Sequence, residues 1–200
     1  MGKFDKRFKE IIASFKELGV ERGTLGCYFD SFITVRDVFF ERARVHKFAI
    51  SQNLTANSIM QQSECSNICY TMISKLHIMI NNVKTLLCES LSISQQDVVD
   101  ICWKLYLSKN SQYGDAWYMN GSFGVFYDLH RKSVRLYEMA LTSQITGEKL
   151  SSNSSFENTI IDTINYCTML IIAIESCEIH LFEATGACIF EMRNFDDVEI

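Results

Sequence analysis

The stretch NICYTMISKLHIMINNVKTLL, residues 67–87, decides the fold class. Its apolar side chains recur three and four positions apart, which places them on one face of an α-helix. They are Ile68, Met72, Ile73, Leu76, Met79, Ile80 and Val83. The chain contains no proline, so we expect this helix to run unbroken from about Ala56 to Leu87.

Similar periodicity elsewhere predicts an all-α fold, a helical bundle of about six helices. The other expected helices lie near residues 4–18, 31–50, 94–108, 125–141 and 154–176. Residues 28–35, taken alone, also fit a strand. Residues 178–192 alternate around a glycine, which fits either a small C-terminal β-hairpin or a continued helix.

Two helix starts carry capping signals, and the segments between helices are polar or rich in glycine. Ser94 is followed by Asp97, and Ser154 is followed by Glu157, so each serine oxygen can accept a bond from a free backbone N–H. Residues 111–124 are expected to form an ordered loop, and residues 142–155 a mobile connection.

Composition and charge exclude several classes of protein. The 200 residues are 48% hydrophobic and 22% charged, which is typical of a single globular domain. The net charge of -5 disfavours a broad surface for extended nucleic acid. No apolar run is long enough to span a bilayer, so we expect a soluble, cytoplasmic protein with no membrane partner. The eight cysteines lie in apolar helical patterns and are expected to be reduced thiols in the core.

The expected domain, residues 1–200, divides into three parts by role. Residues 1–97 form N-terminal helices with no assigned role. Residues 98–177 hold the helices that carry the most function-like side chains. Residues 178–200 form a C-terminal appendage.

Two of the expected helices present polar faces. The first face carries Asp128, Arg131, Lys132 and Arg135, and the second carries Asn158, Asp162, Asn165 and Tyr166. Facing each other in a bundle, such helices can hold Mg²⁺ with carboxylates and phosphate oxygens with cations. Hydrolysis of a polyphosphate needs both, because the metal and the cations neutralise the charge that develops at phosphorus.

A structural explanation competes with this one at most positions. Asp128 beside Arg131 is more simply a solvated ion pair, and Glu157 is explained by capping. Asp162 is different because it lies among isoleucines, where an unpaired carboxylate is costly, so a partner cation or metal is expected. His130 in a basic helix is more often a surface residue than an acid or base.

Aromatic residues near the expected loop have two interpretations. Tyr113, Trp117 and Phe123 could stack on a nucleotide base, or they could pack the loop onto the bundle. The sequence does not decide between the two.

Three segments, in this order, resemble the nucleotide-modification-associated domain family. They are K-N-x-x-Y-G-x-A-W from Lys109, R-K-x-x-R-L from Arg131 and N-x-x-x-D-x-x-N-Y from Asn158. That family is similar to the MazG-like all-α nucleoside triphosphate pyrophosphohydrolases, and the resemblance covers roughly residues 104–174. It implies a helical bundle, usually a homo-oligomer, that binds a nucleotide with Mg²⁺ and cleaves between its α- and β-phosphates.

The resemblance also implies roles for particular residues. Asp162, together with Glu157, would bind Mg²⁺ and serve catalysis. The substrate-binding residues would be Lys109, Tyr113, Trp117, Lys132, Arg135 and Tyr166. Asn158 and Arg131 stand where the family pattern has acids, so catalysis could be lost while binding is kept.

Three hypotheses follow. The first is a Mg²⁺-dependent nucleoside triphosphate pyrophosphohydrolase-like protein. The alternative is a non-catalytic nucleotide-binding or protein-interaction helical module. The third is a purely structural bundle in which Asp162 is salt-bridged.

Overall fold

The computed structural model describes residues 2–13, 25–51, 63–119 and 121–176, and this part of the chain contains helices and no strand. The helices are α1 (Asp5–Ala13), α2 (Leu25–Ser51), α4 (Ser63–Leu91), α5 (Gln95–Tyr113), α6 (Ala116–Met119), α7 (Gly121–Thr146) and α8 (Ser154–Glu175), with a 3₁₀ turn, η1, at Leu150–Ser152. The predicted all-α bundle is confirmed.

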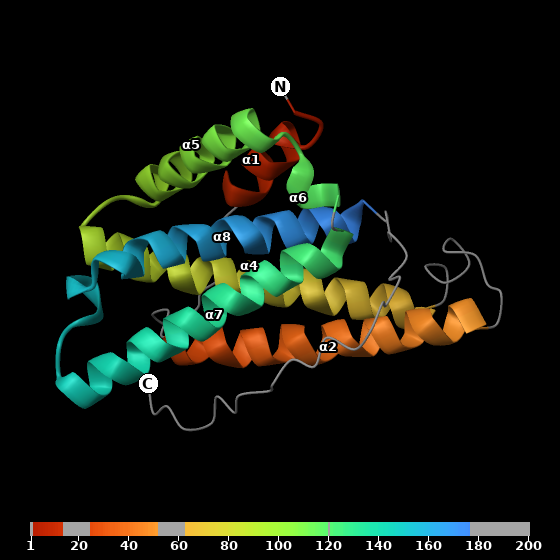
Figure 1. Cartoon of the computed structure of the whole chain (residues 1–200), viewed down its shortest axis with the longest axis horizontal. Coiled ribbons are helices and arrows are strands. Elements are labelled where there is room, and N and C mark those ends of the chain that lie inside the picture. Colours follow the sequence, from red (N-terminus) through yellow and green to blue (C-terminus); the bar gives the residue numbers. More distant parts are fainter. Residues whose placement is uncertain (1, 14–24, 52–62, 120, 177–200) are drawn as a thin grey trace.

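Four long helices, α2, α4, α7 and α8, form the body of the bundle (Figure 1). The most extensive packing between helices is that of α2 with α4, α7 with α8, and α4 with α8. The shorter α1 and α5 lie against each other, and both contact α8. Helix α8 is therefore covered from several sides, and most of its side chains are buried.

An aromatic layer joins α2 to α7. Phe126 of α7 stacks on Phe39 of α2 with the ring centroids 4.2 Å apart, and Phe32 lies parallel to Phe126 at 6.4 Å. Nearby, the Tyr28 hydroxyl and the Ser133 hydroxyl are hydrogen-bonded at 2.6 Å. Since Tyr28, Phe32, Val35 and Phe39 are all fully buried at helical spacing, the strand interpretation of residues 28–35 was wrong.

Two glycines set helix boundaries that differ from the ones expected from the sequence. Helix α5 continues past the expected end near Ser108 to Tyr113 and stops at Gly114, whose φ is +59°. Gly121, with a φ of +61°, begins α7 four residues earlier than expected. The segment predicted as a loop, residues 111–124, is therefore mostly helical and includes α6.

One capping prediction is confirmed and one is wrong. The Ser94 oxygen accepts from the Asp97 backbone, and the Asp97 carboxylate accepts from the Ser94 backbone, which completes a capping box. At α8 the capping residue is Asn153, whose side chain accepts from the Ser155 N–H at 2.9 Å, and Ser154 is already the first helical residue. An asparagine immediately before the serine competes for the same role.

Some predictions concern residues outside the described ranges: the end of the first helix near Gly19, the start of the third near Ala56, and the C-terminal hairpin. The cysteines that the structure describes, Cys27, Cys69, Cys88, Cys102 and Cys167, are all free thiols. In the same ranges, no helix combines the length and the hydropathy that a membrane span requires.

Candidate functional site

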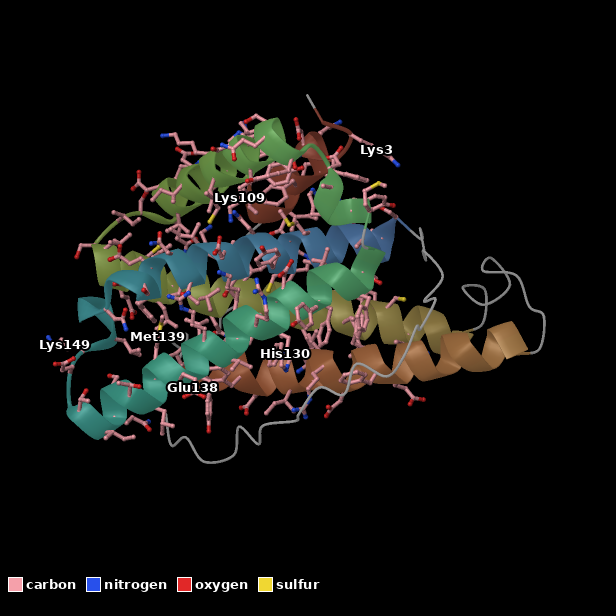
Figure 2. All side chains as sticks on the ribbon, in the orientation of Figure 1. Lys3, Lys109, His130, Glu138, Met139 and Lys149 are labelled. Carbon is pink, nitrogen blue, oxygen red and sulfur yellow. The ribbon has the colours of Figure 1, made fainter. Side chains whose placement is uncertain are left out.

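Three helices each contribute one charged side chain to a single cluster. Asp162 of α8 accepts a hydrogen bond from the Lys132 ammonium of α7, with Oδ2 and Nζ 2.6 Å apart. Its other oxygen, Oδ1, accepts from the Lys109 ammonium of α5 at 3.0 Å. Figure 2 labels Lys109 on α5 where this helix passes α8. We call these residues the Lys-Asp-Lys cluster.

The local sequence of α8 explains why Asp162 needs these partners. The neighbouring Ile160, Ile161 and Ile164 are buried in the core, and the Asp162 side chain is only 17% exposed. Burial alone would raise the pKa of Asp162, but hydrogen bonds from the two lysines, and their charges, hold it below its ordinary value. The carboxylate is therefore ionised, and the predicted partner cation is confirmed twice over.

The two lysines differ in their exposure to solvent. The Lys132 side chain is 17% exposed, whereas the Lys109 side chain is 46% exposed. Lys132 is therefore held inside the junction of the helices, and Lys109 forms its outer edge. A molecule arriving from solvent meets the Lys109 ammonium first.

Two further groups lie near the cluster: an ion pair with no net charge and a tyrosine hydroxyl. Arg131 donates to Asp128 at 3.0 Å on the solvent side of α7. Tyr166 lies one turn beyond Asp162, and burial together with the charges of Asp128 and Asp162 raises its pKa to about 12. At neutral pH, Tyr166 is therefore a neutral hydrogen-bonding group close to the cluster.

The structure separates the remaining predicted site residues. Arg135 is exposed one turn along α7 from Lys132, and Tyr113 is exposed one turn along α5 from Lys109. The Trp117 ring instead packs on Phe4, with centroids 5.4 Å apart, and on Tyr118. For Trp117 the packing interpretation is thus confirmed.

The expected surface position of His130 is wrong. It is half-buried rather than a surface residue, because its ring contacts Phe32 and Phe126 in the layer between α2 and α7. Burial, with a smaller effect of Arg36, lowers its pKa. Phe123 belongs to the same layer, where its ring contacts Phe39.

The donor set around Asp162 does not fit the predicted Mg²⁺ site. Both carboxylate oxygens already accept from ammonium groups. Nowhere in the described ranges do three or more histidine, cysteine, aspartate or glutamate side chains gather into a group that could hold a metal ion. Glu157, the proposed second ligand, lies in the first turn of α8, five positions away and off the face of Asp162.

One charged residue was missed by the sequence interpretation. Lys84 of α4 is only 3% exposed, and burial lowers its pKa to about 8, although the nearby Cys88 and Cys102 oppose the shift. Its position was readable, since Leu76, Ile80 and Lys84 follow one another at intervals of four along the apolar face of α4.

Comparisons with known proteins give no match, whether to a family model, to a curated protein or to a solved structure. The resemblance in residues 104–174 therefore stays a prediction.

Proposed function

We propose that the Lys-Asp-Lys cluster binds the phosphates of a nucleotide without a metal, so that the chain is a nucleotide-binding module rather than a hydrolase. The observation that carries this proposal is the charge ratio: two ammonium groups from separate helices converge on one carboxylate. The Arg131–Asp128 pair beside them is neutral, so the cluster keeps one unbalanced positive charge.

Balancing the charge of Asp162 needs only one of the two lysines. A second ammonium at the same carboxylate adds repulsion between like charges. An anion arriving at the exposed Lys109 relieves that repulsion. Phosphate oxygens suit ammonium groups of this kind, which act as point charges with several donors.

The exposed side chains nearby favour a nucleotide over inorganic phosphate. Tyr113 follows Lys109 by one helical turn, and its side chain is among the most exposed large rings, at 71%. Such a ring, near a cation that binds phosphate, offers a face on which a base can stack. Arg135, exposed on α7 one turn from Lys132, provides a further cation for a longer phosphate chain.

The pyrophosphohydrolase hypothesis requires carboxylates that are free to bind Mg²⁺, and the cluster has none. Mg²⁺ would have to displace at least one lysine from Asp162, and the acids at Asn158 and Arg131 of the family pattern are absent. A homo-oligomer, also implied by the resemblance, remains part of the proposal that only a measurement of mass in solution decides.

The test is a thermal-shift and calorimetric screen of nucleoside mono-, di- and triphosphates, run once with EDTA and once with Mg²⁺. We expect stabilisation that grows with the number of phosphates and persists in EDTA, because a ligand that prefers the native state must stabilise it. Lys132→Met should remove the shift. Lys104→Met, at an exposed position on the same helix as Lys109, is the matched control and should keep it.

Two results would overturn the proposal. One is a shift that appears only with Mg²⁺ and is accompanied by pyrophosphate release, which would restore the hydrolase. The other is the absence of a shift with every nucleotide in a folded protein, which would leave the cluster a structural salt bridge.

A further inference from the structure

The Asp128–Arg131 pair of α7 keeps hydrogen-bonding capacity that the fold does not use. Arg131 donates to Asp128 Oδ1 at 3.0 Å, and both side chains reach solvent, with 37% of Asp128 and 56% of Arg131 exposed. Among the described residues, none donates to Asp128 Oδ2, and none accepts from the other N–H groups of Arg131. An acceptor and several donors are therefore available side by side to a molecule that arrives from solvent.

This pair lies next to the Lys-Asp-Lys cluster. Asp128 precedes Lys132 by one helical turn of α7, so the two side chains are neighbours on one face of the helix. Burial, and after it the charges of Asp128 and Asp162, raise the pKa of Tyr166 to about 12, so this residue of α8 lies near both carboxylates. The pair and the cluster therefore belong to one surface between α7 and α8.

The order of charged residues along α7 matches the order of groups in a nucleotide. Arg135 follows Lys132 in the sequence, and Asp128 precedes it. The rise of the helix between Asp128 and Arg135 is about 10 Å. When phosphates bind at Lys132 and Arg135, the base at the other end of the molecule extends toward Asp128.

The exposed ring of Tyr113 lies toward the same end of this surface as the pair. Helix α5 ends at Tyr113, α6 follows, and α7 begins at Gly121, so the end of α5 and the start of α7 both lie close to α6 (Figure 1). Along α5, Tyr113 is nearer to α6 than Lys109 is. Along α7, Asp128 is nearer to α6 than Lys132 is. One end of the surface thus offers a ring face for stacking and a polar pair for the edge of a base.

An arginine beside an aspartate complements guanine better than the other bases. The Watson–Crick edge of guanine has one acceptor, O6, next to two donors, N1–H and the 2-amino group. Arg131 can donate to the acceptor while Asp128 accepts from the donors. Adenine and cytosine place a ring nitrogen acceptor where guanine has N1–H, and an acceptor facing the carboxylate is left without a hydrogen bond. Uracil shares O4 and N3–H with this pattern but has a second acceptor in place of the amino group.

We propose that Asp128 and Arg131 read the base of the bound nucleotide and that the site therefore prefers guanine nucleotides; this inference rests on the proposed function. Asp162 cannot take the same role, because both of its oxygens accept from lysine ammonium groups. The guanidinium of Arg131 also lies over the Tyr127 ring, 6.0 Å from its centroid, and this contact favours one position of the arginine beside Asp128.

The experiment measures the affinities of GTP, ITP, XTP and ATP by calorimetry in EDTA, for the full-length parent, Asp128→Asn and Asp100→Asn. The parent should bind GTP about tenfold more tightly than ATP, with ITP between them because its base lacks the 2-amino group. Asp128→Asn should lose this preference and bind XTP more tightly than GTP, because the new amide nitrogen can donate to O2 of xanthine. Asp100 is an exposed carboxylate of α5, so Asp100→Asn is the matched control and should keep the order of the parent.

Ratios of affinities decide the outcome, because removing a negative charge near the phosphates strengthens the binding of all four triphosphates alike. The proposal fails if the parent binds ATP as tightly as GTP, or if Asp128→Asn keeps the order of the parent. In both cases triphosphates still bind, so the proposed function stands while the assignment of Asp128 is overturned. If no triphosphate binds the folded parent, the proposed function fails and the preference for guanine falls with it.

Discussion

Lys132 on α7 and Asp162 on α8 form the shortest ion pair of the cluster, at 2.6 Å, and each side chain is 17% exposed. Lys109 from α5 approaches the opposite carboxylate oxygen at 3.0 Å. One carboxylate thus ties three helices together while holding two ammonium groups near each other. We propose that this arrangement recognises anions as well as stabilising the fold.

Asp162→Asn should lower the free energy of unfolding at pH 7 by about 1–2 kcal/mol, because it leaves the ammonium groups without their charged partner. The pKa of Asp162 in the folded chain lies below its ordinary value of 3.8. Its contribution is therefore present above that value and disappears as the pH falls through the folded pKa. Urea unfolding of parent and variant at pH 7, 5 and 3 should show the difference shrinking with acid. A difference independent of pH would contradict this account, and Asp100→Asn is the control.

Lys84→Met should stabilise the chain most below pH 8. The folded pKa of Lys84 is about 8, against 10.5 for the ordinary side chain. Between these values the unfolded chain holds the proton and the folded chain does not, so the stability of the parent rises with pH across this window. Relative to Lys84→Met, that rise should amount to about 2–3 kcal/mol.

The measurement for Lys84 is the difference between the two proteins in chemical unfolding at several pH values from 7 to 10.5. Taking the difference removes the effect of thiols such as Cys167, whose raised pKa lowers stability at alkaline pH in both proteins. If the difference in unfolding free energy between the two proteins does not change with pH, Lys84 keeps its charge when buried.

Arg7→Gln should loosen α1 with little effect on global stability. The Arg7 guanidinium binds both oxygens of Glu175 at the end of α8, at 2.8 and 2.6 Å. Both side chains are partly exposed, so the loss should be below about 1 kcal/mol. Hydrogen exchange should accelerate in α1 alone. Lys6→Gln, whose pairing with Glu10 stays within α1, should leave exchange nearly unchanged, and an equal effect of both variants would contradict a specific link to α8.

Tyr28→Phe should cost about 1 kcal/mol through the lost hydrogen bond to Ser133. Tyr28 is fully buried between α2 and α7, so water cannot replace the missing hydroxyl. Thermal and urea unfolding measure the loss. Tyr127→Phe, at an exposed position of α7, is the control, and equal stability of Tyr28→Phe and the parent would show that the hydroxyl pair adds nothing.

The sequence predicted the class of fold well because helical periodicity is a local signal. The apolar face of residues 67–87 and the Ser94–Asp97 capping box could be predicted without knowledge of distant contacts. Boundaries set by Gly114 and Gly121 were missed, since a glycine within an aromatic segment fits a loop as well as a helix end. Asn153 was missed because Ser154 offered the same capping chemistry one residue later.

The only part of the candidate site that could be predicted was the need of a buried carboxylate for a charged partner. A carboxylate among isoleucines demanded a partner, and the structure supplies Lys109 and Lys132. The contact of α1 with α5 could not have been predicted from the sequence, because it forms only through tertiary packing.

The most direct test of the central claim is the affinity of one nucleoside triphosphate, measured by calorimetry in EDTA, for the parent, Lys132→Met and Asp162→Asn. If the two lysines bind phosphate, Lys132→Met should lose binding, while Asp162→Asn should bind at least as tightly as the parent because a competing anion has gone. Loss of binding in Asp162→Asn, with its fold intact, would contradict the account, because the carboxylate would then be required for binding rather than compete with the phosphates.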